Sequence, residues 1–175
     1  MSQQRDPITC HILDTTVGLP ARNVIVQIHR VREVEDMSNT DTPDSTKSTK
    51  SAKSTAVDYQ VDPPFARAKT NDDGRVVNWV FDPSLQRDQD ASFATTGVRD
   101  GKWVKLVPGL YKIKFLTGKY FKDLAIGGGG GGGVTASAGR TFFPVVEVVF
   151  EVDDLSHYHI PLLLSNYSYS TYRGS

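Results

Sequence analysis

Four histidines are the residues of this chain best suited to chemistry near neutral pH. An imidazole has an ordinary pKa of about 6.5, so it can serve as a general base or as a metal ligand. His157 and His159 stand two residues apart in an alternating segment, which places both side chains on one face of a predicted strand. Together with His11, this pair could hold a zinc ion. Two ordinary surface histidines are the simpler interpretation, because the spacing alone is common.

The first alternating segment separates His11 from the predicted core. Ile8 and Cys10 share the apolar side of that strand, so the ring of His11 is predicted to point the other way. His29 shares a face with the polar Gln27, and we expect it to be solvated.

A cation and the chain end supply further candidate groups. Arg75 follows the sequence Asn-Asp-Asp-Gly at 71–74, a strong hairpin-turn signal, and by itself it is interpreted as an exposed cation. Residues 172–175, Tyr-Arg-Gly-Ser, bring a phenol, a cation, a hydroxyl and a carboxylate together. They follow a strongly patterned strand, so this tail can be docked rather than frayed. The residues alone support a β-sandwich with a His/Arg site.

Composition excludes several classes of protein. Twenty basic residues balance twenty acidic ones, so the sequence has no electrostatic footprint for nucleic acid. No apolar run approaches the roughly 20 residues of a membrane span, and the start carries no hydrophobic signal region. The single cysteine, Cys10, cannot form an internal disulfide, and Cys-rich zinc sites are excluded.

Alternating apolar residues predict an all-β fold. We expect an antiparallel β-sandwich of seven to eight strands with one short helix, at 119–126. The predicted strands span residues 8–13, 23–29, 65–70, 75–81, 111–115, 146–152, 158–164 and 168–173.

Three inserted loops dilute the apolar content of the chain. Residues 1–7 are predicted as a tail, and 8–175 as a single domain with insertions at about 35–58, 82–102 and 127–139. Ten of the 24 residues at 35–58 are Ser or Thr, too polar to form a core of their own. Seven consecutive glycines occupy 127–133, but no Lys-Ser/Thr follows them, so a phosphate-binding loop is not predicted.

Longer stretches of this sequence resemble the transthyretin-like family, and within it the 5-hydroxyisourate hydrolases. The matching blocks are 8–30 (with ITCHILD), 70–76 (TNDDGRV), 109–125, and 143–175 (with HYHIPLLL and the terminal YRGS). The ending YRGS is the mark that separates the hydrolases from the hormone-carrying transthyretins. The resemblance implies a catalytic set of four residues, with three more in the tail that bind substrate. These are His11, Arg75, His159 and Ser175, and then Tyr172, Arg173 and Gly174.

The same resemblance implies a reaction and an assembly. Water would open a ring C–N bond of 5-hydroxyisourate, a product of urate oxidation, without any cofactor. His11 would act as the base and His159 would orient water or relay a proton, although the reverse assignment stays open. Arg75 would stabilise the developing oxyanion. The family implies a homotetramer built as a dimer of dimers. A cytoplasmic location, or a peroxisomal one by pathway, is expected, since no clear targeting signal is present.

Other functions remain open at this point. The leading alternative is a non-enzymatic carrier of an aromatic ligand of the thyroid-hormone type in the tetramer channel. An interaction scaffold that works through the loop at 35–58 is another, and a zinc hydrolase using His11, His157 and His159 is a third.

The position of YRGS gives a prediction about the chain end. A tag fused after Ser175 should lower hydrolysis of 5-hydroxyisourate far more than the same tag placed before Met1, because only the first crowds the tail. Ultraviolet absorbance of the fresh substrate measures both rates. Equal rates for the two tagged proteins would argue that the tail is not part of the site.

Overall fold

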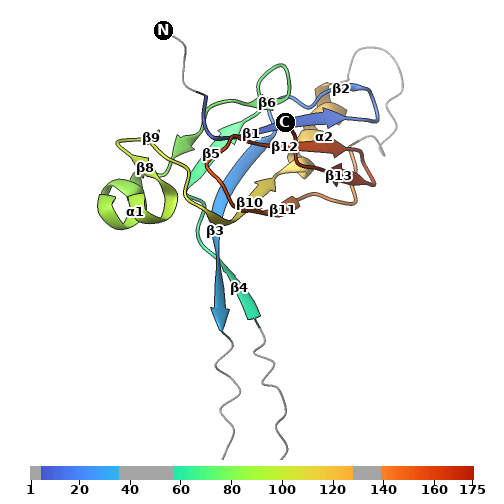
Figure 1. The fold of residues 1–175 in the computed structure, drawn as a ribbon. Helices are drawn as coiled ribbons and strands as arrows, with labels where there is room; N and C mark the ends of the chain where they lie inside the picture. The colour runs from blue at the N-terminus through green and yellow to red at the C-terminus, as the bar shows by residue number, and fades with distance from the viewer. Residues whose placement is uncertain (1–4, 36–56, 128–138) are drawn as a thin grey trace, which may run out of the picture.

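Two β-sheets face each other in this computed structural model, which describes residues 5–35, 57–127 and 139–175 (Figure 1). The first sheet has the strand order β13-β12-β1-β2, with β6 also paired to β1. Its strands are β1 (Ile8–Asp14), β2 (Leu19–Pro20), β6 (Arg75–Val76), β12 (Tyr158–Leu164) and β13 (Tyr169–Thr171).

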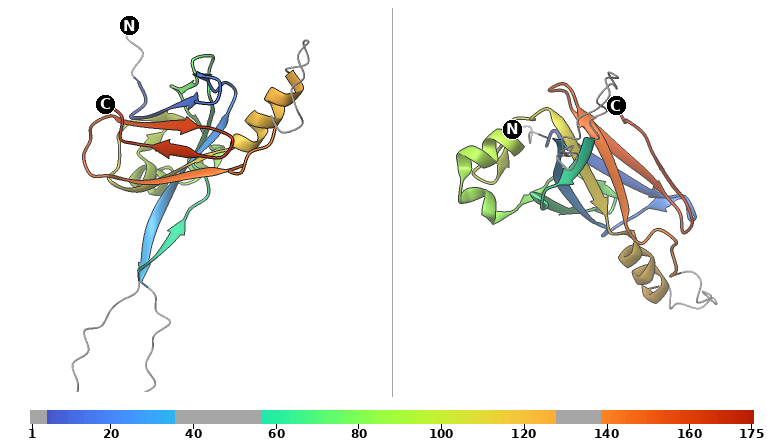
Figure 2. Two further views of the ribbon diagram at one scale, coloured as in Figure 1. Left: turned by 90° about the vertical axis from the view of Figure 1, so that its right-hand side faces the viewer. Right: turned by 90° about the horizontal axis from the view of Figure 1, so that it is seen from below.

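The second sheet has the order β11-β10-β3-β5-β7, with β4 paired to the far end of β3. Its strands are β3 (Ile25–Glu35), β4 (Val57–Val61), β5 (Ala66–Lys69), β7 (Val80–Phe81), β10 (Gly109–Phe115) and β11 (Val146–Val152). The outer part of β3 and its partner β4 run beyond the two sheets as a two-stranded arm (Figures 1 and 2). A separate short pair consists of β8 (Val98–Arg99) and β9 (Lys102–Trp103).

Side chains from both sheets fill one hydrophobic core. Ile8, Cys10 and Ile12 from β1 are fully buried, as are Ile113 and Phe115 from β10. Burying a side chain of this size contributes about 1.5–3 kcal/mol. The predicted all-β sandwich is therefore confirmed as the fold class. One pair departs from the antiparallel pattern, because β1 and β12 run parallel. The chain between them includes every strand of the second sheet, as well as β2 and β6, and supplies the long connection that parallel neighbours require.

The predicted helix at 119–126 is confirmed as α2 (Thr117–Gly127), but a second helix was missed. The stretch 82–102, predicted as a connection, contains η1 (Pro83–Gln86) and α1 (Gln89–Thr96). Polar residues and a glycine in this stretch, which are typical of loops, serve here as the caps of the two helices. Asp82 accepts a hydrogen bond from the Ser84 backbone, Asp88 accepts one from Ala91, and Gly97 ends α1 with φ 72°. Figure 2 shows α1 and α2 at opposite ends of the molecule.

The predicted hairpin at 71–74 is wrong in its partners. Asn71 does form a tight turn, because its side-chain oxygen accepts hydrogen bonds from the backbone N–H groups of Asp73 and Arg75. However, the turn connects β5 in the second sheet to β6 in the first. The predicted strand 75–81 is accordingly two short strands in different sheets. The turn residues determine only the local reversal of the chain. The strand after the turn pairs with β1, where Val76 is buried at 1 % exposed.

His29 is a further correction. It was expected to be solvated, yet only 7 % of it is exposed, and its Nδ1 donates to the Asp62 carbonyl at 2.9 Å. The strand β3 is central in its sheet, and the chain leaving β4 covers this part of it. The alternation of residues along one strand cannot predict that a distant segment packs over one of its faces.

The predicted loops at 35–58 and 127–139 lie mostly outside the described residues, apart from the ends of β3, β4 and α2. The division into one domain with three insertions stays a prediction. No helix among the described residues is long and apolar enough to cross a membrane.

Gly74 gives a testable consequence of the turn before Arg75. Its φ is 70°, and an added Cβ would lie 2.5 Å from the Ile12 carbonyl oxygen. Gly18 has nearly the same φ, 69°, but nothing within 4 Å of an added Cβ. Gly18→Ala should therefore cost only the left-handed backbone penalty, about 1–2 kcal/mol. Gly74→Ala should cost clearly more, because backbone must also move. Urea unfolding of both variants measures the difference, and equal losses would contradict the overlap at Ile12.

Candidate functional site

Strand register brings the predicted functional residues onto one face of the first sheet. β1 is bordered by β12 on one edge, where Thr9 pairs with His159. On its other edge it is bordered by β6, where His11 pairs with Arg75. Since Ile8 and Cys10 of β1 point into the core, the alternate positions of β1 face outward. Residues that are far apart in sequence are thus side by side across three adjacent strands.

A buried hydroxyl joins the two histidines of β12. Thr9 is only 1 % exposed, and its Oγ1 lies 3.0 Å from His157 Nε2 and 2.9 Å from His159 Nδ1. The two rings stack with their centroids 6.4 Å apart and their planes 18° apart. One hydroxyl therefore fixes the orientation of both rings.

The C-terminal tail is docked against His159. The Gly174 N–H donates to the His159 carbonyl at 2.8 Å and forms an antiparallel bridge with it. A Cβ on Gly174 would lie 2.5 Å from His159 Cδ2, so a residue without a side chain is needed for this approach. Ser175 is exposed beyond this bridge. The prediction that the tail is docked, not frayed, agrees with this geometry.

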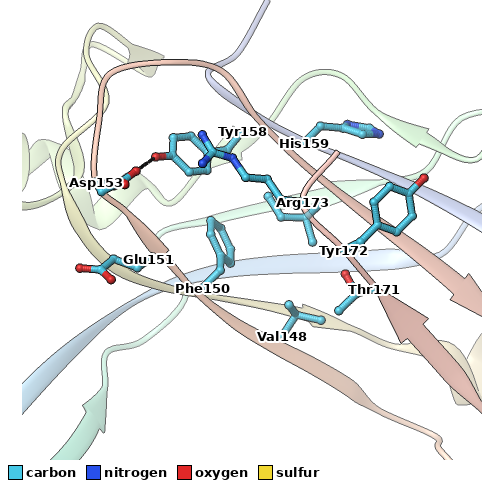
Figure 3. Close-up of a pocket in the computed structure, with 10 residues that line it drawn as sticks. Val148, Phe150, Glu151, Asp153, Tyr158, His159, Thr171, Tyr172 and Arg173 are labelled. Carbon is cyan, nitrogen blue, oxygen red and sulfur yellow. Dashed lines mark hydrogen bonds between the residues drawn. The ribbon is translucent and has the colours of Figure 1, made fainter. Parts of the chain in front are cut away.

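Alternation along the tail divides its side chains between two directions. Arg173 stacks its guanidinium over the Tyr158 ring, 4.7 Å from the ring centre, on the opposite side from His159 (Figure 3). Tyr172 lies on the same side of the tail as the His159 ring. The structure therefore brings His11, Arg75, His159 and Gly174 together, with Ser175 next in the chain, whereas Arg173 points away from the histidines.

A cavity of about 380 Å³ opens beside the tail, between the inner faces of β11, β12 and β13. It reaches His159, Tyr172 and Arg173, but His11 and Arg75 do not line it. Its lining residues are Val148, Phe150, Glu151, Asp153, Tyr158, His159, Ile160, Thr171, Tyr172 and Arg173. The cavity therefore borders the cluster at His159, while His11 and Arg75 lie outside its lining.

Electrostatics keep His159 uncharged. Burial lowers its pKa to about 4, and the neighbouring cation of Arg75 adds to this effect, followed by smaller contributions from His11, His157 and Arg5. The pKa of His157 is lowered in the same direction by burial and by Arg5. Both rings on Thr9 are therefore neutral at pH 7.

His11 has a different balance of neighbours. Burial and Arg75 lower its pKa below 6.5, but a hydrogen bond to the Asp73 backbone and the Asp73 carboxylate oppose this shift. His11 thus has an acidic neighbour that opposes the lowering of its pKa, whereas the causes that shift the pKa of His159 all lower it.

Metal binding finds little support in the described part of the chain. Within it, no group of three His, Cys, Asp or Glu side chains is placed to hold a metal ion. In the zinc hypothesis, His157 and His159 are two of the three ligands, and one nitrogen of each, Nε2 of His157 and Nδ1 of His159, contacts Thr9.

Thr9 and Arg5 are the parts of the site that sequence reasoning missed. Thr9 stands two residues before His11 in an alternating strand, so the pattern already placed both on one face. Nothing in the pattern indicated that its hydroxyl would meet His157 and His159, because that contact depends on the pairing of β1 with β12.

Comparison with known proteins then places the chain in a family. The model of the HIUase/Transthyretin family matches residues 8–174. The chain belongs to the HIUase/Transthyretin family. A Deinococcus radiodurans protein named 5-hydroxyisourate hydrolase is 32 % identical over 169 residues, which cover 96 % of this chain and 95 % of that protein. A mouse protein of the same name is 27 % identical over 176 residues, the full length of both chains.

Solved structures agree with this family membership. An (S)-allantoin synthase matches with a TM-score of 0.53 and 26 % identity, and the match covers 99 % of this chain and 45 % of that longer one. A Klebsiella pneumoniae 5-hydroxyisourate hydrolase matches with a TM-score of 0.50 and covers 96 % of this chain and 92 % of its own. At 20 % identity, this second likeness shows the fold alone.

The charge of Arg75 should be measurable at His159. Replacing Arg75 by Gln removes a cation that lowers the pKa of His159, so that pKa should rise from about 4 toward its ordinary value. Nuclear magnetic resonance titration of the His159 ring measures this directly. Arg67→Gln is the control, because Arg67 lies in the other sheet and is not among the causes of the shift. An unchanged His159 titration in Arg75→Gln would contradict the placement of the guanidinium.

Proposed function

We propose that this protein hydrolyses 5-hydroxyisourate. The observation that carries the proposal is the grouping of His11, His159 and Arg75 on one face of the first sheet. The chain in which this occurs aligns over nearly its whole length with proteins named for that activity. The product is 2-oxo-4-hydroxy-4-carboxy-5-ureidoimidazoline, formed when water attacks a ring carbonyl and the ring C–N bond breaks.

The attack needs a base that is neutral at the working pH, and His11 is the better candidate. A general base works best when its pKa lies near the operating pH. The Asp73 contacts oppose the lowering of the His11 pKa, whereas among the described residues nothing opposes it at His159, whose pKa is about 4. His11 therefore takes the proton of the attacking water, and the neutral His159 accepts a second hydrogen bond from that water and orients it.

Arg75 supplies the charge that the transition state requires. Its register position beside His11 supports this role, in which the guanidinium faces the negative charge that develops on the carbonyl oxygen. A preorganised donor of this kind contributes about 2.7–4 kcal/mol to transition-state stabilisation. The planar guanidinium also matches an oxygen-rich ring. Because the histidines are uncharged at pH 7, Arg75 does not compete with protonated imidazoles for the developing negative charge.

The tail completes the site in this proposal. Gly174 packs against His159, so the hydroxyl of the next residue, Ser175, is proposed to hold an imidazole or the substrate. Tyr172 lies on the His159 side and is proposed to contact substrate. Arg173 is proposed to bind substrate only by leaving its stacking position on Tyr158, and otherwise it anchors the tail.

A homotetramer, arranged as a dimer of dimers, is the proposed assembly. The polar face that carries His11 and His159 is one outer face of the sandwich, so a second copy could close it into a channel around the substrate. The proposal predicts that the site residues lie near the contact between dimers. Small-angle scattering or analytical ultracentrifugation would determine the number of subunits.

Two substitutions test the proposed reaction. His11→Ala should lower kcat/KM for fresh 5-hydroxyisourate by roughly 10²–10⁴-fold, the usual contribution of a general base. Arg75→Ala should lower it by about 10²–10³-fold. Ultraviolet absorbance follows the substrate above its spontaneous decay. Arg22→Ala, at an exposed arginine on the loop after β2, is the control and should keep full activity.

Two results would contradict the proposal. Unchanged rates in both His11→Ala and Arg75→Ala would remove the assigned roles. Tight capture of an aromatic ligand by the wild-type protein, with no hydrolysis of 5-hydroxyisourate, would favour the carrier function instead.

A further inference from the structure

One hydroxyl stands between two histidine rings that differ in their relation to the site. Thr9 Oγ1 is within hydrogen-bond distance of His157 Nε2 and of His159 Nδ1. His159 lies beside His11 and Arg75, whereas His157 is two residues away and is given no role in the reaction proposed above. The contact through Thr9 links the tautomers of the two rings.

Two arrangements place the Thr9 hydroxyl proton in one of these two contacts when both rings are neutral; if both rings donated to Thr9, neither contact would use that proton. A threonine hydroxyl has one proton to donate, and it can accept from a second group. In one arrangement, Thr9 donates to His159 Nδ1 and accepts from His157 Nε2–H, which leaves the proton of His159 on Nε2. In the other, His159 Nδ1–H donates to Thr9, and Thr9 donates to His157 Nε2. The two tautomers are therefore coupled through a single buried proton.

The surroundings of His159 favour the second arrangement. The Arg75 guanidinium is a cation with donors only, and it faces the site beside His159. Because Nδ1 contacts Thr9, Nε2 is the ring nitrogen left to interact with other groups of the site, and a nearby cation stabilises a lone pair there more than an N–H. A bare Nε2 can also accept a hydrogen bond from the attacking water, as the proposed function requires.

We propose that Thr9 is a positioning residue that holds the His159 proton on Nδ1, and that His157 maintains this state by accepting the Thr9 hydroxyl proton. In this hydrogen-bond network, His159 Nδ1–H donates to Thr9 Oγ1, and the Thr9 hydroxyl donates to His157 Nε2. This inference rests on the proposed hydrolysis for its effect on rate, but the tautomer of His159 does not depend on any substrate.

Protonation of His157 should reverse the arrangement. A charged imidazole donates from both nitrogens, so His157 could no longer accept from Thr9, and the buried Thr9 hydroxyl would keep a partner for its proton by donating to His159 Nδ1. Among the described residues, the charged or titratable groups that shift the pKa values of this pair are Arg5, Arg75 and His11, with Asp73 acting on His11. His11 is the neighbouring histidine whose titration must be followed separately.

A matched pair of substitutions tests the role of the hydroxyl. Thr9→Val keeps the shape of the buried side chain but removes the hydroxyl, and Thr9→Ser keeps the hydroxyl. Loss of the outer hydrogen bond that fixes a functional histidine costs about 10–100-fold in metal sites. We expect a loss of that order in kcat for Thr9→Val, with little change in KM, and rescue to within a few-fold by Thr9→Ser. Equal kcat values for Thr9→Val and the wild-type protein would overturn the proposal.

Nitrogen-15 resonances of the histidine rings test the tautomer directly in the full chain. In the wild-type protein at pH 7, His159 should carry its proton on Nδ1 and His157 should have an unprotonated Nε2. As the pH falls and His157 gains its proton, the His159 proton should move to Nε2, before His159 itself becomes charged. Site-specific signals separate these events from the titration of His11.

Each outcome of this measurement decides between the alternatives. An Nε2–H tautomer of His159 at pH 7 would overturn the proposal, as would protonation of His157 without any change at His159. These readings need no folded variant, so they stand if Thr9→Val is unstable. Absence of hydrolysis by the wild-type protein would contradict the proposed function, while the tautomer measurement would still decide the role of Thr9.

Discussion

The parallel pairing of β1 with β12 is the constraint on which the site depends. These strands are the N-terminal and penultimate strands of the chain, and their register sets Thr9 opposite His159. The register is held from the other side of the sheet, where Ile8, Ile12 and Leu162 are fully buried in the core. A slip by one residue would turn an entire strand over and carry His159 into the core, at a large cost in burial. Packing on the inner face of the sheet thus determines which side chains lie next to one another on the outer face.

The same pairing explains why the two ends of the sequence meet in the site. β13 continues the sheet beyond β12, and the tail that follows it stays in register as far as the Gly174 bridge to His159. β6 reaches the opposite edge of β1 only because the turn at Gly74 carries the chain from the second sheet to the first. The cation and the tail therefore approach the histidines from two sides of one strand pair.

Much of this arrangement was accessible from the sequence because it follows local alternation. The strands, the outward direction of His11, and the shared face of His157 and His159 are properties of a period of two residues. What alternation could not supply is which strand pairs with which, and this is where the predictions failed. The hairpin at 71–74 was assigned the wrong partner, and His29 was expected in solvent because its cover comes from a distant segment. The helix α1 was missed for another reason, since it has few apolar residues and its caps look like loop signals. The Thr9 contacts required both the register and the side-chain geometry.

The identity of the group that orients His159 has an electrostatic consequence. A carboxylate in the place of Thr9 would orient the ring equally well, but its negative charge would favour the imidazolium and raise the pKa of His159. The threonine hydroxyl is neutral, so burial and the cation of Arg75 act without opposition and hold that pKa at about 4. The acidic residue that does oppose them, Asp73, acts on His11 instead. His159 is thereby kept neutral beside Arg75. In the proposed reaction, the choice of a hydroxyl at position 9 leaves Arg75 as the charge that faces the reacting carbonyl, because the hydroxyl adds no negative charge that would favour a protonated imidazole beside it.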